Sequence, residues 1–438
     1  MRATALAHFQ AGRFAEAEAI CGRLLAADPA DVDLLLLAAF VACRDGRFEI
    51  GIDRLECLLA LRPDHGPALV ALGAAFVLRG QHEAAADTYR RALDLPSVPT
   101  GVPLALGRSL LALGDTAAAI RMLERAATEI PDDAPTRYEL ATAYLMAGDF
   151  EQGWPAYRWR WQTPEFAGRA RHAELPPWRG AAAVPPDAGR LLVWGEQGVG
   201  DEIMFAGAIP ALAATGIPCL LDCDPRLVPL FRRSFPNVAV RAHDVAPPDI
   251  AAQVPSGDLA RGLGGGLSRA SAYLKACPSR RAALRARYAD GRPLVGLSWH
   301  TVNPRSGALR SIALSALQRL LARADVRWVS LQYGVASGTG AALLMDDQLD
   351  PLADLDGFAA QVAAMDLVVT IDNSTAHMAG ALGVPTWLLL PFEADWRWMT
   401  AADSSLWYPS VRLFRQRRSH DWAPVIAAVD QALTRQFA

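Results

Sequence analysis

A run of small polar residues follows an apolar stretch late in the chain, where it could hold an anion. The run is DNSTAHMAGALGVPT, residues 372–386, and LVVTI precedes it. His377 would lie in the first turn of the next helix and point toward that anion. Without needing a metal, the start of this helix could bind a phosphate or diphosphate through capping groups and N–H donors, supplied by Asp372, Asn373, Ser374 and Thr375. The pattern fits equally a well-capped helix with an incidental histidine.

A glycine-rich turn earlier in the chain could bring a carboxylate to a ligand. It reads GEQGVGD, residues 195–201, and follows the apolar stretch RLLVW. Glycines let a ligand approach the backbone, and a helix N-terminus favours an anion. The turn is neither the G-x-G-x-x-G dinucleotide fingerprint nor a P-loop with its Lys-Ser/Thr. Asp201 is therefore either a group that acts on a ligand or an N-cap, worth about 1 kcal/mol.

A third polar segment, SWHTVNPRSGALRSI at residues 298–312, also follows an apolar stretch. Its larger side chains could clamp a phosphate or sugar hydroxyls, and these are Trp299, His300, Asn303, Arg305 and Arg310. A solvated polar loop is the alternative on local grounds. We find no metal-binding spacing and no Gly-x-Ser-x-Gly nucleophile elbow in the sequence.

Short apolar stretches that alternate with helical patterns must position these three segments. A first set comprises RLLVW (190–194), CLLD (219–222), VAV (238–240) and a weaker DIAAQV (249–254). A second set comprises residues 293–299, 328–333, 366–372 and 385–391. Two such sets predict two parallel-sheet, Rossmann-like lobes, at 190–285 and 286–438, the second ending in a helix. Ligands then bind at the carboxyl ends of the strands, in a cleft between the lobes.

The first third of the chain carries an internal repeat. Gly12, Gly46, Gly80, Gly114 and Gly148 each follow the previous one by 34 residues, and Pro29, Pro63 and Pro131 lie 17 residues after three of them. This period is that of the tetratricopeptide repeat, a helical hairpin that must stack on its neighbours. Glycine ends the first helix of each hairpin and proline ends the second. We therefore expect a solenoid of five repeats over residues 1–165.

The fifth repeat is atypical and carries aromatic residues where the earlier repeats have small and aliphatic ones. These are Trp154, Tyr157, Trp159 and Trp161. They suggest a terminal repeat that docks on the next domain. A proline-rich linker is expected to follow at residues 166–189.

Composition excludes several classes of protein. The net charge of −3 gives no overall field that would recruit nucleic acid or an acidic membrane. The six cysteines form no C-x-x-C pair, which is typical of buried thiols in a reducing compartment. No apolar run is long enough to span a bilayer, and the first residues lack the features of a signal peptide. We expect a cytoplasmic protein.

Together these segments resemble the two-lobed GT-B glycosyltransferases of the heptosyltransferase type, and bacterial proteins that fuse tetratricopeptide repeats to such a domain. The resemblance rests on the GDFEQGW…RW end repeat, PPWRG (176–180), WGEQGVGDEIMF (194–205), DNSTAHMAGALGVP and WYPSVRLFRQ (407–416). It implies a metal-independent, inverting enzyme whose substrate is a nucleotide sugar and which needs no cofactor.

The resemblance also implies roles for individual residues. Gly200-Asp201, followed by Pro210, matches the family's proposed catalytic base, and His377 belongs to the same catalytic set. The donor's phosphates would lie on the turn from Asp372 through Asn373, Ser374 and Thr375, assisted by Arg310. Further donor contacts are assigned to Trp299, His300 and Gln332. In the glycine-rich turn, Gly198 and Gly200 offer backbone, while Glu196 and Gln197 face the acceptor.

LQYG (331–334), DWRW (395–398) and WYPS (407–410) resemble most closely proteins linked to flagellin modification. That match implies a protein acceptor recruited by the repeats, such as flagellin, and a nonulosonic acid such as pseudaminic acid as the sugar. Two alternatives stay open. One is a non-catalytic scaffold with a degenerate transferase lobe, and the other is a heptosyltransferase-like enzyme of lipid-linked saccharide synthesis.

Overall fold

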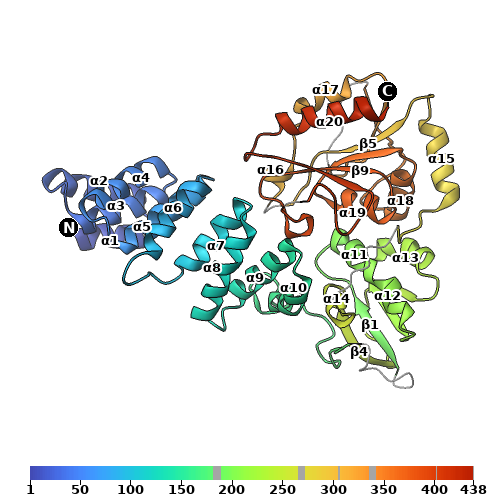
Figure 1. Ribbon diagram of the computed structural model, residues 1–438, viewed down its shortest axis with the longest axis horizontal. Coiled ribbons are helices and arrows are strands. Elements are labelled where there is room, and N and C mark those ends of the chain that lie inside the picture. Colours follow the sequence, from blue (N-terminus) through green and yellow to red (C-terminus); the bar gives the residue numbers. More distant parts are fainter. Residues whose placement is uncertain (181–188, 265–271, 304–305, 335–341, 401, 438) are drawn as a thin grey trace. The chain divides into compact units, whose positions relative to one another are not determined.

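The computed structural model describes residues 1–180, 189–264, 272–303, 306–334, 342–400 and 402–437. The chain divides into two compact units, Met1–Ala147 and Gly148–Ala438. Figure 1 shows the first as helices only and the second as a mixture of helices and strands.

The first unit is a series of helical hairpins, as the repeat predicts. Each of the five periodic glycines has a positive φ, between 69° and 79°, just beyond the first helix of its hairpin. The helices are α1 (Arg2–Gln10), α2 (Phe14–Ala27), α3 (Val32–Arg44), α4 (Phe48–Leu61), α5 (Gly66–Leu78), α6 (His82–Leu93), α7 (Val102–Ala112), α8 (Thr116–Glu129) and α9 (Ala134–Ala147).

Small residues let these helices approach closely. A Cβ at Gly73 would lie 2.5 Å from the ring of Tyr89, and one at Gly107 would lie 2.9 Å from Leu123. Ala85 and Ala119 are fully buried in the facing helices. The predicted helical repeats are confirmed over residues 1–147, and the predicted end of the solenoid at residue 165 stays a prediction.

The second unit begins with α10 (Phe150–Tyr157) and the short helix η1 (Arg158–Gln162), followed by a four-stranded parallel sheet. The strands are β1 (Arg190–Trp194), β2 (Cys219–Cys223), β3 (Ala239–Ala242) and β4 (Ile250–Pro255), in the order β3-β2-β1-β4. The helices between and after them are α11 (Val199–Phe205), η3 (Ala206–Ala208), α12 (Ile209–Ala214), η4 (Pro225–Leu227), α13 (Val228–Ser234), η5 (Ser256–Asp258) and α14 (Leu259–Gly262).

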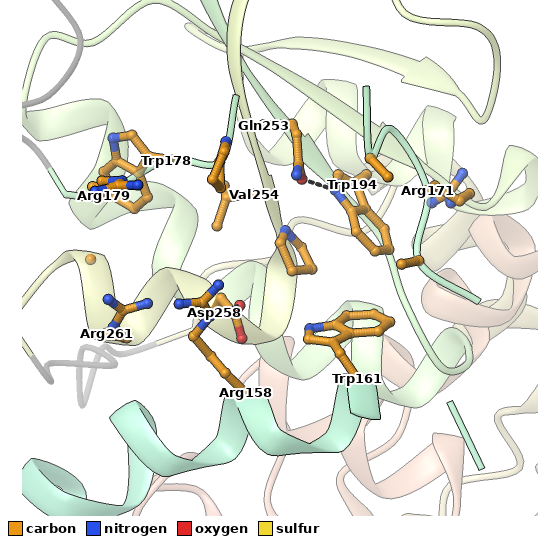
Figure 2. A pocket seen from close by; sticks show the side chains of 15 residues that line it. Arg158, Trp161, Arg171, Trp178, Arg179, Trp194, Gln253, Val254, Asp258 and Arg261 are labelled. Carbon is orange, nitrogen blue, oxygen red and sulfur yellow. Dashed lines mark hydrogen bonds and ion pairs between the residues drawn. The ribbon is translucent and has the colours of Figure 1, made fainter. Parts of the chain in front are cut away.

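Part of the predicted linker adds to the edge of this sheet. Pro177 forms a parallel bridge with Gln253 of β4, and the backbone N–H of Trp178 donates to the Gln253 carbonyl at 2.8 Å. The Gln253 side chain accepts from the indole of Trp194, at the end of β1 (Figure 2). Pro185 and Pro186, from the same predicted linker, lie outside the described residues.

The second sheet has six parallel strands in the order β10-β9-β8-β5-β6-β7. They are β5 (Leu294–Ser298), β6 (Arg327–Ser330), β7 (Leu343–Leu344), β8 (Leu367–Ile371), β9 (Thr386–Leu390) and β10 (Val411–Arg415). The accompanying helices are α15 (Pro278–Tyr288), α16 (Gly307–Arg310), η6 (Leu314–Leu317), α17 (Gln318–Leu321), α18 (Leu355–Ala363), α19 (Ser374–Ala381), η7 (Trp396–Trp398) and the terminal α20 (Ala423–Gln436).

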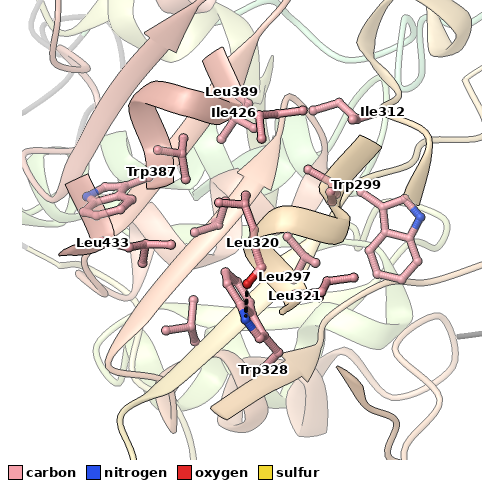
Figure 3. Packing of buried hydrophobic residues seen from close by; sticks show 14 of the residues in the cluster. Leu297, Trp299, Ile312, Leu320, Leu321, Trp328, Trp387, Leu389, Ile426 and Leu433 are labelled. Atoms are coloured by element: carbon pink, nitrogen blue, oxygen red, sulfur yellow. Dashed lines mark hydrogen bonds between the residues drawn. The ribbon is translucent and has the colours of Figure 1, made fainter. Parts of the chain in front are cut away.

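A large hydrophobic core fills one side of this sheet, between the strands and helices α17 and α20. Figure 3 shows Leu320, Ile426 and Leu433 packed against Trp328 and Trp387 of the strands. The indole N–H of Trp328 donates to the Leu320 carbonyl at 2.9 Å. The two predicted parallel-sheet lobes are confirmed, whereas the apolar pattern gave no strand at β7 or β10. No helix in the described ranges is long and apolar enough to cross a bilayer.

Candidate active site

The strand order of the second sheet reverses between β5 and β8. From β5, one half of the sheet runs through β6 and β7 and the other through β8, β9 and β10, the order of a doubly wound fold. The crevice outside the carboxyl ends of β5 and β8 is where such a sheet binds ligands. The predicted polar segments at 298–312 and 372–386 both begin at this edge.

The start of α19 is held by Asn373. Its side-chain oxygen caps the helix by accepting from the N–H of Thr375 at 3.0 Å, and its amide donates to the hydroxyl of Ser298 at 2.9 Å. The Thr375 side chain is fully buried, and its hydroxyl has no hydrogen-bond partner among the described residues. The predicted capped helix start is present, and Asn373 also joins β8 to β5.

Five charged side chains form a chain of ion pairs across the site. Arg310 lies 3.0 Å from Asp372 and 3.5 Å from Asp395. Arg397 bridges Asp395, at 2.7 Å, and Asp201 of the first lobe, at 2.5 Å. The sequence brought Arg310, Asp372 and Asp201 to attention by motif, and the structure brings them into one network.

The chain of ion pairs has two guanidinium groups for three carboxylates. Burial raises the pKa of Asp201 and of Asp372, although Arg397 and Arg310 act in the opposite direction. At Asp395 burial also disfavours the charge, but Arg397 and Arg310 outweigh it and lower the pKa. Asp201 is thus the member of the first lobe whose proton affinity is enhanced, which suits a proton acceptor.

Asp201 does not cap its helix. Gly198 is the N-cap residue of α11 and Asp201 lies in the first turn, with its carboxylate on Arg397. The N-cap alternative is therefore wrong. Glycine at position 200 suits the packing of α11 against α19, because a Cβ there would lie 3.1 Å from the His377 ring.

His377 is buried and neutral at ordinary pH. Its ring stacks on Trp398 with centroids 5.2 Å apart, and Nδ1 lies 2.9 Å from the hydroxyl of Tyr408. Burial, aided by the charges of Arg397 and Arg310, lowers its pKa to about 3. A neutral imidazole can position a ligand through a hydrogen bond, but it adds no positive charge opposite a phosphate.

Glu196 and Gln197 belong to a clamp at the base of the glycine-rich turn. Both carboxylate oxygens of Glu196 accept from the fully buried Arg160, at 2.7 and 2.9 Å, and one accepts from the N–H of Gly257. Gln197 adopts a φ of 68° and donates to the hydroxyl of Tyr157 at 3.1 Å. Their predicted contact with an acceptor stays a prediction.

The residues predicted to contact the donor differ in their burial and hydrogen bonding. The indole of Trp299 packs in the hydrophobic core (Figure 3). Gln332 is buried and braces the loop, since its oxygen accepts from the N–H groups of Trp299 and His300 and its amide donates to the His300 carbonyl. His300 is partly exposed and Ser374 faces α11 near Gly200. Arg305 lies outside the described residues.

Sequence reasoning missed Asp395 and Arg397 as members of the site. Both are in the loop after β9, in the run DWRW (395–398), where Arg397 lies between two tryptophans. Arg397 is 9% exposed. Charged residues just after a strand of a parallel sheet are the signal that could have found them.

Comparison with known proteins supports the reading of the first unit. Models described as tetratricopeptide repeat match residues 1–23, 36–100 and 110–153. The N-terminal unit consists of tetratricopeptide repeats. Solved structures similar to it include MamA, at 22% identity and a TM-score of 0.35 over 37% of this chain and 95% of that one. Another is YrrB, a TPR protein with an unusual peptide-binding site, at 16% identity and a TM-score of 0.31 over 33% and 75%.

A relative extends beyond the tetratricopeptide repeats. Protein FlbA of Caulobacter vibrioides is 32% identical over 372 residues, which cover 76% of this chain and 60% of FlbA. The match therefore includes much of the α/β unit, because the repeats alone end at Ala147. This chain spans only 60% of the length of the relative that it matches.

Proposed function

We propose that this protein is a nucleotide-sugar-dependent glycosyltransferase that modifies a protein acceptor bound by the tetratricopeptide repeats. The observation that carries the proposal is that two helix starts meet. One is the start of α19, where the strand order of the second sheet reverses, and the other is the start of α11 in the first lobe. Asp201 and Arg397 join them. The donor's phosphate would lie at the start of α19, near Thr375 and Arg310.

Asp201 would take the proton of the acceptor hydroxyl as the sugar moves to it, with inversion at the anomeric carbon. A general base of this kind contributes about 10²–10⁴-fold. Asp201→Asn should therefore lose about that factor in transfer while still binding the donor. Asp249→Asn is the matched control, because Asp249 pairs with Arg190 at the other end of the strands, outside the crevice. Full transfer by Asp201→Asn would remove Asp201 from the role.

The donor can be identified by a thermal-shift screen over CMP-, UDP-, GDP- and ADP-sugars, because a ligand of the folded state raises the melting temperature. The enzyme should respond to one nucleotide class and retain transfer in EDTA. The alternative, a non-catalytic scaffold, is supported by one observation: each of the five charged side chains described in the crevice already has a protein partner. Silence across all donors would favour the scaffold.

For the finer assignment we propose flagellin as acceptor and a nonulosonic acid such as pseudaminic acid as sugar. The support is the sequence resemblance at residues 331–334, 395–398 and 407–410. Mass spectrometry of flagellin from cells with and without this protein tests it. An unchanged flagellin mass would overturn the acceptor assignment and leave the transferase proposal to the donor screen.

A further inference from the structure

The strand order of the first sheet also reverses, between β1 and β4: β2 and β3 follow on one side of β1, and β4 lies on the other. A cavity of about 160 Å³ lies at this edge, lined by Trp194 at the end of β1 and by residues 253–255 of β4. Figure 2 shows Trp161 and Trp194 on one side of it and Arg158, Arg179 and Arg261 around the rest. This is a ligand-binding position of an open sheet, and it is separate from the crevice at β5 and β8.

A second cavity of about 450 Å³ adjoins the first. The two share Trp161, Arg171 and Trp194 as lining residues, and the second continues along the glycine-rich turn from Gly195 to Val199. We call the pair the arginine groove. It extends from the edge of β4 to the glycine-rich turn before α11, the helix that contains Asp201.

The acidic side chains of the arginine groove are neutralised by the protein itself. Asp258 and Glu196 are held by the buried Arg160, and Asp224 pairs with Arg226 at 2.7 Å. The fourth, Glu202, lies 3.3 Å from His243.

Three exposed arginines of the groove make no ion pair with any described residue, and these are Arg169, Arg179 and Arg261. Arg158 lies 3.6 Å from Asp258, a carboxylate that Arg160 already holds. The groove therefore carries unbalanced positive charge in a chain whose net charge is −3.

We propose that the arginine groove binds an acidic segment of a polypeptide, which on the proposed function is the acceptor. Arginine clusters recognise acidic motifs through paired hydrogen bonds, and tryptophan with arginine dominates protein interfaces. The indoles of Trp161 and Trp194 offer apolar walls between the charges. A groove of two adjoining cavities fits an extended chain better than a single small anion.

The test measures peptide binding by the full chain, using fluorescence anisotropy. The probe is a labelled short peptide in which glutamate alternates with valine and serine, and its control has glutamine for glutamate. We expect the acidic peptide to bind at least about tenfold more tightly than its control, as charge-assisted pairing requires. The double variant Arg179→Glu/Arg261→Glu should abolish that difference.

Arg281→Glu is the matched control, because Arg281 is exposed on α15, has no ion pair with a described residue and lies outside the groove. It should change the affinity less than about twofold. Equal affinity for both peptides, or equal loss in both variants, would overturn the proposal. Tighter binding of a hyaluronan oligosaccharide would replace the peptide by an acidic saccharide. Each result is independent of whether transfer occurs.

Discussion

In each lobe a turn joins a strand to the helix that follows it, but different interactions hold the two turns. The turn into α19 is fixed from within: Asn373 caps the helix and reaches the neighbouring strand end. The turn into α11 has no side-chain cap, and Gln197 adopts a left-handed φ. Its geometry depends on Arg160, 36 residues earlier in the chain.

The difference shows that one half of a site can be fixed by neighbouring residues and the other half by residues distant in the chain. The asparagine cap lies within the turn that it holds. By contrast, Glu196 is held by the guanidinium of Arg160, which comes from the tryptophan-rich segment before the sheets, and it also accepts from the N–H of Gly257. Loss of the distant partner should therefore cost more than loss of the local one.

Removing the distant partner is the strongest way to test this comparison. Arg160→Met leaves Glu196 and Asp258 without their buried partner, so the free energy of unfolding should fall by about 3–5 kcal/mol. Urea unfolding of the α/β unit, followed by tryptophan fluorescence, measures it. Arg158→Met, which removes a half-exposed pair at 3.6 Å, should cost less than about 1 kcal/mol. Equal costs in the two variants would refute a structural role for Arg160.

The local cap should give a smaller effect. Asn373→Ala removes the cap and the bond to Ser298, at a cost of about 1–3 kcal/mol in the free energy of unfolding. Asn373→Asp keeps the capping oxygen and loses only the amide donor, so it should retain part of the stability. The same urea measurement applies. If the aspartate variant were as unstable as alanine, the bond between β8 and β5 would outweigh the cap.

His243 of the first lobe and His377 of the second are held in opposite charge states. Burial disfavours the charged form of His243, but its bonds to Asp222 and Glu202 raise its pKa to about 9. Its stabilising contribution is therefore full below the unfolded value near 6.5 and lost as pH rises through about 9. The stability difference between wild type and His243→Gln should shrink over that range, and NMR titration of the ring should show the midpoint. A midpoint near 6.5 would remove the ion pair from the folded state in solution.

His377 should show the reverse dependence. Because its pKa is lowered to about 3, the folded protein keeps this ring neutral while the unfolded chain takes up a proton below about 6.5. Stability should fall between these two values and the fall should be weaker in His377→Gln. A His377 ring that titrates near 6.5 would contradict its burial against Trp398.

Local patterns in the sequence predicted more of the fold than of the site. The glycine period gave the hairpins, and apolar stretches gave most strands, because both depend on residues close along the chain. The strand β10 was not predicted, because Arg412 and Arg415 interrupt its apolar pattern. Arg160, Asp395 and Arg397 could not be assigned partners in advance, since each meets residues from another strand end. The roles of Asp201 and the α19 turn in transfer stay predictions.

The Arg160 clamp has a practical consequence for dividing the protein into parts. Residues 148–166 look like the last repeat in sequence, but their buried side chains pack on both lobes: Trp154 contacts Trp396 of the second lobe, and Arg160 pairs with Glu196 of the first. A truncated protein that starts after residue 166 would expose Trp396 and leave Glu196 without its arginine. Cutting at Gly148 should instead release an α/β unit that folds without the repeats, so that the contribution of the repeats to acceptor binding can be measured separately.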